Sequence, residues 1–194
     1  IKATAEQMRE FMERELSGLE LCAIFIDGIE FKKQMLVVAL GLDKKGKKHI
    51  LGLWQGATEN STVCNNLLDD IERRGLDMGK DYLFVLDGSK ALRTSVAKKF
   101  GSIRLQRCQQ HKRRNVRDHL PPEHQEAIDA RIRAAYNMTD YDKAKKSLDL
   151  TVRYLERLNP SAAASLREGL EETLTLHKLG VTGLLRKTLS TTNP

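Results

Sequence analysis

The chain has 194 residues, of which 40% are hydrophobic and 30% charged, and its formal net charge is +7. This composition favours a folded domain with one core, or one core with an insertion, over a disordered chain. No apolar run approaches the ~20 residues that cross a bilayer, and the first residues do not form a secretory signal, so we expect no membrane protein. The basic charge favours a polyanionic partner, although an ordinary basic protein has the same balance.

The three cysteines are Cys22, Cys64 and Cys108. Their number is odd, and Cys22 lies inside an apolar run. A disulfide framework is therefore not expected, and we predict a reducing, cytoplasmic setting. The chain begins without an initiator methionine, and we interpret it as part of a longer protein.

The first half of the chain has the pattern of a sheet with helices on its faces. The apolar spacing predicts a helix over residues 4–16 and then three short-looped strands, over residues 21–26, 34–42 and 49–54. Helices over residues 58–74 and 89–100 then alternate with short strands over residues 82–86 and 103–105. A strongly basic helix is predicted over residues 106–119, before two prolines. From residue 122 onward the apolar spacing is helical only.

Two aspartates stand out because their contexts match. Asp27 and Asp87 each follow an apolar run, and each is followed by glycine. Carboxylates at the carboxyl ends of neighbouring strands would converge, and Mg²⁺ between them would relieve their repulsion. Asp-Gly is also a common turn dipeptide, so a strand-ending turn explains either motif equally well. Both interpretations remain open from the residues alone.

A basic segment follows the second aspartate. It contains six basic residues and no acidic one before Asp118: Arg104, Arg107, Lys112, Arg113, Arg114 and Arg117. Such residues on one helix could meet DNA phosphates, and we favour this over a solvated helix face because most such faces mix both signs.

Cys108 and His111 have half the spacing of a zinc site. A structural zinc site needs four ligands, and no second pair with suitable spacing exists, so we do not expect zinc. A buried cysteine and a hydrogen-bonded histidine at a helix start is the alternative.

Four segments together resemble the Mutator-type transposases of bacterial insertion sequences. They are Phe-Ile-Asp-Gly at 25–28, Val-Leu-Asp-Gly-Ser-Lys-Ala-Leu at 85–92, Cys-Gln-Gln-His-Lys-Arg-Arg-Asn at 108–115 and Thr-Thr-Asn-Pro at 191–194. The Asp-Gly motifs are individually weak. The Cys-x-x-His motif with its basic tail, followed at a distance by Thr-Thr-Asn-Pro, is much more specific.

The resemblance implies an α/β fold with a ribonuclease H-like mixed sheet, flanking helices and an all-helical insertion. It implies an N-terminal helix over residues 1–20, a catalytic core over 21–121, the insertion over 122–189 and a return to the core over 190–194. It further implies a catalytic triad in which Asp27 and Asp87 are the two aspartates, while the glutamate follows Thr-Thr-Asn beyond Pro194. Mg²⁺ or Mn²⁺ would be the cofactor in a two-metal site, incomplete in this stretch.

The implied activity is metal-dependent cleavage and strand transfer at the ends of an insertion sequence, by a DNA-associated protein that self-associates in a transposition complex. The expected absence of the glutamate keeps a different class open, namely a non-catalytic DNA-binding or assembly module, or a degenerate transposase fragment. A ribonuclease or resolvase on the same fold is disfavoured by the Cys-x-x-His and Thr-Thr-Asn-Pro segments.

Overall fold

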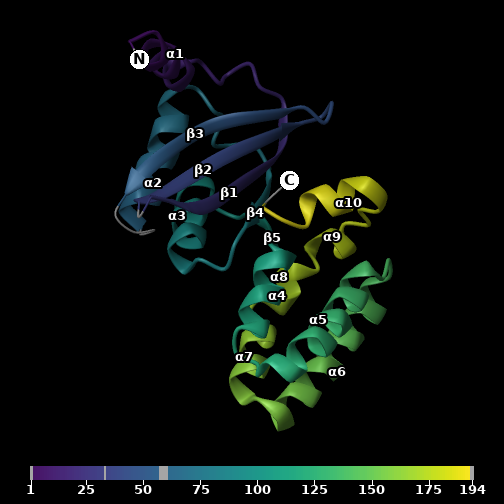
Figure 1. The fold of residues 1–194 in the computed structure, drawn as a ribbon. Helices are drawn as coiled ribbons and strands as arrows, with labels where there is room; N and C mark the ends of the chain where they lie inside the picture. The colour runs from purple at the N-terminus through teal and green to yellow at the C-terminus, as the bar shows by residue number, and fades with distance from the viewer. Residues whose placement is uncertain (1, 33, 57–60, 193–194) are drawn as a thin grey trace. The chain divides into compact units, whose positions relative to one another are not determined.

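The computed structural model describes residues 2–32, 34–56 and 61–192 (Figure 1). The fold is mixed α/β, and its five-stranded sheet has the strand order β3-β2-β1-β4-β5. By its contacts the chain divides into two compact units. The first unit comprises residues 1–84 and 89–104, and the second comprises residues 85–88 and 105–194. In the part of the chain that the structure describes, no helix combines the length and the apolar character needed to span a membrane.

The first unit opens with α1 (Lys2–Glu13) and continues into an antiparallel meander. Its strands are β1 (Leu21–Phe31), β2 (Gln34–Asp43) and β3 (Lys48–Gly56). The predicted turn between β2 and β3 is closed by Asp43, whose carboxylate accepts hydrogen bonds from the backbone N–H groups of Lys45 and Lys47, both at 2.9 Å. The predicted meander is therefore present, with longer strands than expected.

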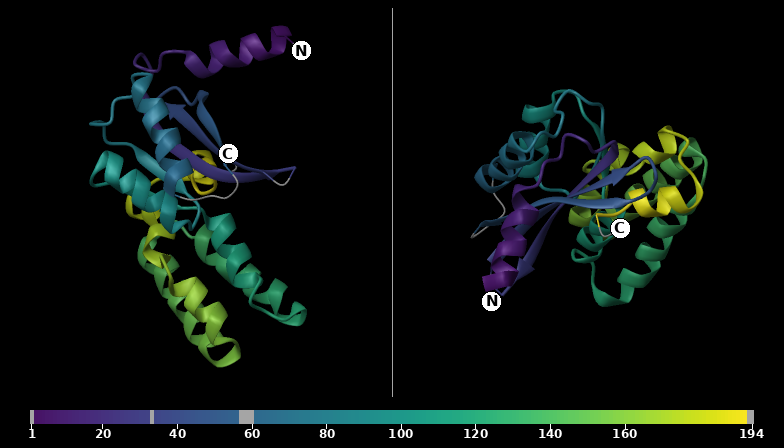
Figure 2. Two further views of the ribbon diagram at one scale, coloured as in Figure 1. Left: turned by 90° about the vertical axis from the view of Figure 1, so that its left-hand side faces the viewer. Right: turned by 90° about the horizontal axis from the view of Figure 1, so that it is seen from above.

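Two helices of the first unit, α2 (Ser61–Arg73) and α3 (Lys90–Phe100), lie on one face of the meander (Figures 1 and 2). The helical spacing predicted for α2 is seen in its buried face of Val63, Leu67, Leu68 and Ile71. The start predicted for this helix, at residue 58, lies outside the described residues. Helix α3 begins after Ser89, whose hydroxyl accepts a hydrogen bond from Leu92 N–H at 3.3 Å.

The short strands β4 (Leu83–Leu86) and β5 (Arg104–Arg107) complete the sheet, and α4 (Gln109–Arg117) follows β5 almost directly. The basic segment is therefore divided between a strand and a helix, whereas a single helix over residues 106–119 was predicted. Gln106 and Arg107 belong to β5, and α4 begins only at Gln109, after its N-cap residue Cys108.

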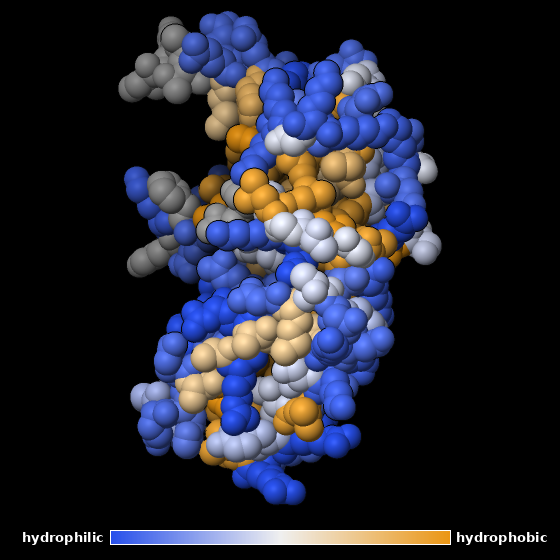
Figure 3. Space-filling view, turned by 90° about the vertical axis from the view of Figure 1, so that its right-hand side faces the viewer, coloured by the Kyte–Doolittle hydropathy of each residue, from blue (hydrophilic) through white to orange (hydrophobic). Residues whose placement is uncertain are grey.

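From Pro122 to Leu189 the secondary structure of the described residues is helical. The helices are α5 (Pro122–Asn137), α6 (Tyr141–Leu158), α7 (Pro160–Arg167), α8 (Leu170–Thr173), α9 (Thr175–Lys178) and α10 (Gly183–Leu189). Helices α5 and α6 lie side by side (Figures 1 and 2). Their apolar stripes join α4 and α7 in one buried cluster that includes Val116, Ile132, Leu148, Leu155 and Leu166. Hydrophobic side chains (orange) also appear between hydrophilic ones on the face drawn in Figure 3.

Candidate active site and its supporting contacts

Asp27 lies inside β1, not at its end as the sequence analysis predicted. The strand continues for four residues beyond Asp27, because pairing with β2 persists from Asp27 opposite Val38 to Phe31 opposite Gln34. Asp27 itself is half-buried and directly follows the fully buried Ile26. The Asp-Gly dipeptide here therefore does not make a strand-ending turn.

Asp87 directly follows β4, as predicted, and is also half-buried. Two residues later, Ser89 caps α3, so Asp87 lies in the short link between a buried strand and a helix. In the strand order of the sheet, β4 is next to β1, the strand that contains Asp27. Among the described residues, no group of three or more His, Cys, Asp or Glu side chains is placed to hold a metal ion.

Gly88, which follows Asp87, lies against the guanidinium of Arg107. A Cβ atom added at Gly88 would collide with Nη2 of Arg107, and one added at Gly169 would collide with Nη1. The Arg107 guanidinium thus lies in a space that both glycines leave open, next to the residue that follows Asp87. Gly169 also has a left-handed φ of 62°, which favours glycine independently.

Arg107 and Lys112 are buried, contrary to the expectation of a basic surface facing DNA. Arg107 donates to the Glu168 backbone carbonyl at 3.1 Å and to its carboxylate at 3.2 Å. The Lys112 ammonium donates to the same carbonyl at 2.6 Å and to the carbonyl of Ser165. These carbonyls end helix α7, where a cation is favourable because the last turn lacks intrahelical donors. Both residues therefore cap a helix.

Burial has an electrostatic consequence for Lys112. Desolvation and the nearby Arg107 charge lower its pKa to about 8, although Glu168 and Glu172 act in the opposite direction. The side chain of Lys112 is fully inaccessible, whereas that of Glu168 is about half exposed at 52%. Glu168 is thus a supporting residue that the sequence analysis did not identify, and no local pattern could have paired it with residues 56 and 61 positions away.

Two other members of the basic segment are held by acidic residues. Arg113 makes a two-pronged ion pair with Asp129 of α5, with N–O distances of 2.7 and 2.6 Å. Arg104 pairs with Asp81 at 2.6 Å on an exposed surface. Only Arg114 and Arg117 are exposed and, within the described residues, outside any ion pair. Of the six basic residues predicted to bind DNA, two are therefore buried, two are held in ion pairs and two are exposed without an ion pair among the described residues.

Cys108 and His111 hold the segment Thr191–Thr192 against the start of α4. The buried Cys108 sulfur accepts from the N–H of His111 at 3.5 Å and from the N–H of Thr192 at 3.4 Å. The Thr192 hydroxyl lies 3.3 Å from Nδ1 of His111. Gln109 N–H also donates to the Ser190 carbonyl at 2.8 Å. We call this set of contacts the Cys108 clasp; Asn193 and Pro194 of the predicted motif lie outside the described residues.

The clasp changes the acidity of Cys108. Burial alone raises the pKa of the thiol, but the hydrogen bonds from His111, Thr192 and Thr191 outweigh this effect and lower the pKa to about 7. With a pKa of about 7, a substantial fraction of the Cys108 thiol is ionised at neutral pH. The buried cysteine and hydrogen-bonded histidine match the non-zinc alternative of the sequence analysis.

Comparison with known proteins shows that the chain is similar to transposases named for insertion sequence elements. The "Transposase for insertion sequence element IS6120" of Mycolicibacterium smegmatis is 30% identical over 195 residues, covering 97% of this chain and 59% of that protein. The ISRM5 transposase of Rhizobium meliloti is 28% identical, covering 92% of this chain and 46% of that protein. The IS256 transposase of transposon Tn4001 from Staphylococcus aureus is 26% identical, covering 70% of this chain and 35% of that protein. The chain thus spans between 35% and 59% of the length of these relatives.

A family model described as "Transposase, Mutator family" matches residues 1–194, the whole chain. The chain belongs to the Mutator family of transposases.

Proposed function

We propose that this chain is the catalytic-core part of a DNA transposase that cuts and transfers DNA strands at the ends of an insertion sequence. The observation that carries the proposal is the family match over residues 1–194. The relatives described above are transposases of insertion sequences by name, which supports the same activity. The strand order, with an antiparallel meander next to β4 and β5, supports a ribonuclease H-like arrangement of the core.

We further propose that Asp27 and Asp87 hold Mg²⁺ or Mn²⁺. Both are carboxylates, the hard oxygen donors that these ions prefer, and their strands are neighbours in the sheet order. When bound, a divalent ion supplies positive charge that stabilises the phosphodiester oxygens during strand cleavage. The two aspartates supply part of the ligand set, and the family resemblance supports a glutamate after Thr-Thr-Asn as the third carboxylate.

The role of the chain's own residues is to orient the two carboxylates. The buried strands β1 and β4 hold the backbone at both positions, with Ile26 and Leu86 packed immediately before each aspartate. Gly88 leaves space for Arg107, which brings a fixed positive charge close to the backbone that follows Asp87. Asp27 lies on a strand and Asp87 directly after one, and such rigid elements position a site better than long loops do.

Asp27→Asn and Asp87→Asn are each expected to weaken Mn²⁺ binding at least about tenfold, because an amide replaces a charged ligand. Titration calorimetry with Mn²⁺ measures the effect. Asp118→Asn, at the exposed end of α4, is the matched control and should leave binding unchanged. Mn²⁺ binding that survives the combined Asp27→Asn and Asp87→Asn substitutions would contradict the assignment.

The partners and location follow from the same proposal. We expect the protein to act on DNA ends and target DNA, to self-associate in a transposition complex and to work in the cytoplasm in association with DNA. The net charge of +7 supports a polyanionic partner.

A further inference from the structure

Helix α6 (Tyr141–Leu158) has one buried and one exposed side. The buried side consists of Ala144, Leu148, Thr151, Val152 and Leu155, which face the core of the second unit. The exposed side carries four basic residues: Lys143, Lys146, Arg153 and Arg157. At 3.6 residues per turn these four fall within about 80° of the helix circumference. We call them the α6 basic face.

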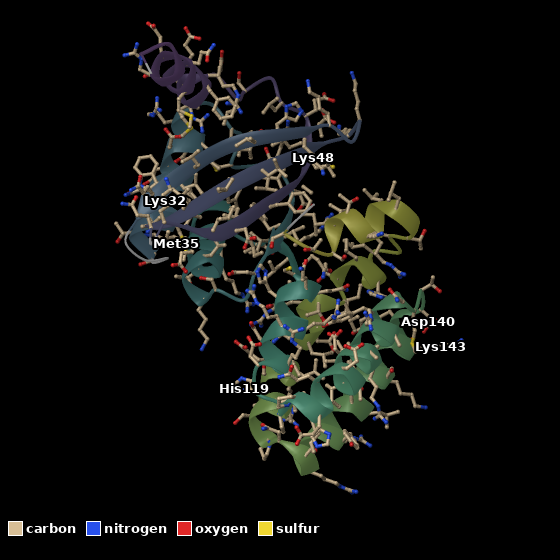
Figure 4. All side chains as sticks on the ribbon, in the orientation of Figure 1. Lys32, Met35, Lys48, His119, Asp140 and Lys143 are labelled. Atoms are coloured by element: carbon tan, nitrogen blue, oxygen red, sulfur yellow. The ribbon has the colours of Figure 1, made fainter. Side chains whose placement is uncertain are left out.

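The acidic residues of α6 lie beside this face and are mostly engaged elsewhere. Asp149 pairs with Lys145 at 3.0 Å, and Glu156 pairs with Arg167 of α7. Asp142 borders the face in the first turn of the helix. Within the described part of the chain, none of the four basic residues takes part in an ion pair. Figure 4 shows Lys143 near Asp140 at the start of α6. The four cations therefore lie outside the ion pairs of the described residues, and Asp140 and Asp142 lie only at the N-terminal end of the face.

Two exposed non-polar side chains accompany the basic residues. Leu150 is 55% exposed and Tyr154 is 45% exposed. The guanidinium of Arg131, from α5, lies 4.8 Å from the centre of the Tyr154 ring and holds that ring at the edge of the face. Tyrosine hydroxyls, like Lys and Arg side chains, are among the groups that donate hydrogen bonds to DNA phosphates.

We propose that the α6 basic face binds the phosphate backbone of double-stranded DNA. Lys143 and Arg157 are 14 positions apart, about 21 Å along the helix axis at 1.5 Å per residue. This equals the rise of about six base pairs at roughly 3.4 Å each, so one duplex can meet all four cations. The face takes the role that the sequence analysis gave to the basic segment, in which Arg107 and Lys112 are buried. The inference rests on the proposed function for the identity of the polyanion.

The test removes four charges from the face in the full 194-residue chain, with Lys143→Gln, Lys146→Gln, Arg153→Gln and Arg157→Gln. The matched control removes four charges elsewhere, with Lys44→Gln, Lys45→Gln, Lys47→Gln and Lys48→Gln at the exposed turn between β2 and β3. Binding of a short labelled DNA duplex is measured by fluorescence anisotropy across a NaCl series. EDTA is present, so the result does not depend on Asp27, Asp87 or a metal.

We expect the α6 variant to bind at least about tenfold more weakly and its log-log salt slope to fall by about 3 to 4, because each lost phosphate contact contributes about 0.9 to the slope. The control variant should retain most of the wild-type slope. An unchanged slope in the α6 variant, or equal losses in both variants, would overturn the proposal. A loss of binding to anionic vesicles without a loss of DNA binding would overturn it as well. Circular dichroism verifies that both variants are folded.

Failure here is distinguishable from failure of the catalytic proposal. If Asp27→Asn and Asp87→Asn abolish Mn²⁺ binding while the α6 variant binds DNA normally, the catalytic assignment stands and the α6 surface is wrong. If the α6 variant loses DNA binding while the Asp27→Asn and Asp87→Asn variants still bind Mn²⁺, the DNA-binding surface stands and the metal-ligand assignment is wrong.

Discussion

Lys112→Ala is expected to lower the free energy of unfolding by about 3 kcal/mol. The substitution removes a fully buried side chain whose aliphatic stem fills space comparable to that of methionine, for which truncation costs about 2–5 kcal/mol. It also leaves the carbonyls of Ser165 and Glu168 without the ammonium that they now accept from. Chemical denaturation followed by circular dichroism measures the loss.

Arg114→Ala is the control, because Arg114 is an exposed basic residue on the same helix. Its effect on the free energy of unfolding should stay within about 0.5 kcal/mol. Lys112→Met keeps the side-chain volume and should lose less stability than Lys112→Ala. If Lys112→Ala and Arg114→Ala have equal small effects, Lys112 is a solvated surface residue and the helix-capping account is wrong.

The stability of the chain is expected to increase between pH 7 and pH 9 through the Cys108 clasp. The folded-state pKa of Cys108 is lowered from 9.0 to about 7, so the folded protein favours the thiolate. Its contribution is therefore fully present above about pH 9 and is lost as the pH falls through about 7. A shift of two pKa units corresponds to about 3 kcal/mol at most. Denaturation curves at a series of pH values measure it.

Cys108→Ser isolates this contribution. Lys112, whose pKa is lowered to about 8, also makes stability rise with pH above that value, and this contribution persists in the variant. The difference between wild type and Cys108→Ser should therefore grow between pH 7 and 9. A difference that is independent of pH would show that the thiol remains protonated. Hydrogen exchange at the Thr192 amide, which donates to the Cys108 sulfur, provides a local readout.

The sequence predicted those parts of the fold that depend on short-range patterns. The alternation of apolar runs and turns predicted the meander, and helical spacing predicted α2, α5 and α6. The boundaries were less predictable. Strand β1 continues past Asp27-Gly28 because its pairing with β2 continues, and no local signal distinguishes this from a turn.

The direction in which each basic side chain points could not be predicted, because the decisive partners are distant in sequence. Arg107 and Lys112 are buried against Glu168, and Arg113 pairs with Asp129. The uninterrupted run of positive charge therefore did not show which of its members are buried or paired and which are exposed. Similarly, the approach of the Arg107 guanidinium to Gly88 is visible only in three dimensions.

The contact of Cys108 with Thr192 joins residues 84 positions apart. In the sequence, only the resemblance to the transposase family associates the two segments. The structure supplies that link, because Cys108 and His111 at the start of α4 hydrogen-bond to Thr192 of the Thr-Thr-Asn-Pro segment.

We propose that Asp27 and Asp87 carry metal-dependent DNA strand cleavage. The most direct test is cleavage of a labelled insertion-sequence end in Mg²⁺ or Mn²⁺ by a transposase chain that includes the proposed glutamate after Thr-Thr-Asn. We predict cleavage by this protein and none by its Asp27→Asn or Asp87→Asn variants when these remain folded. Cleavage that persists in both aspartate variants would contradict the account.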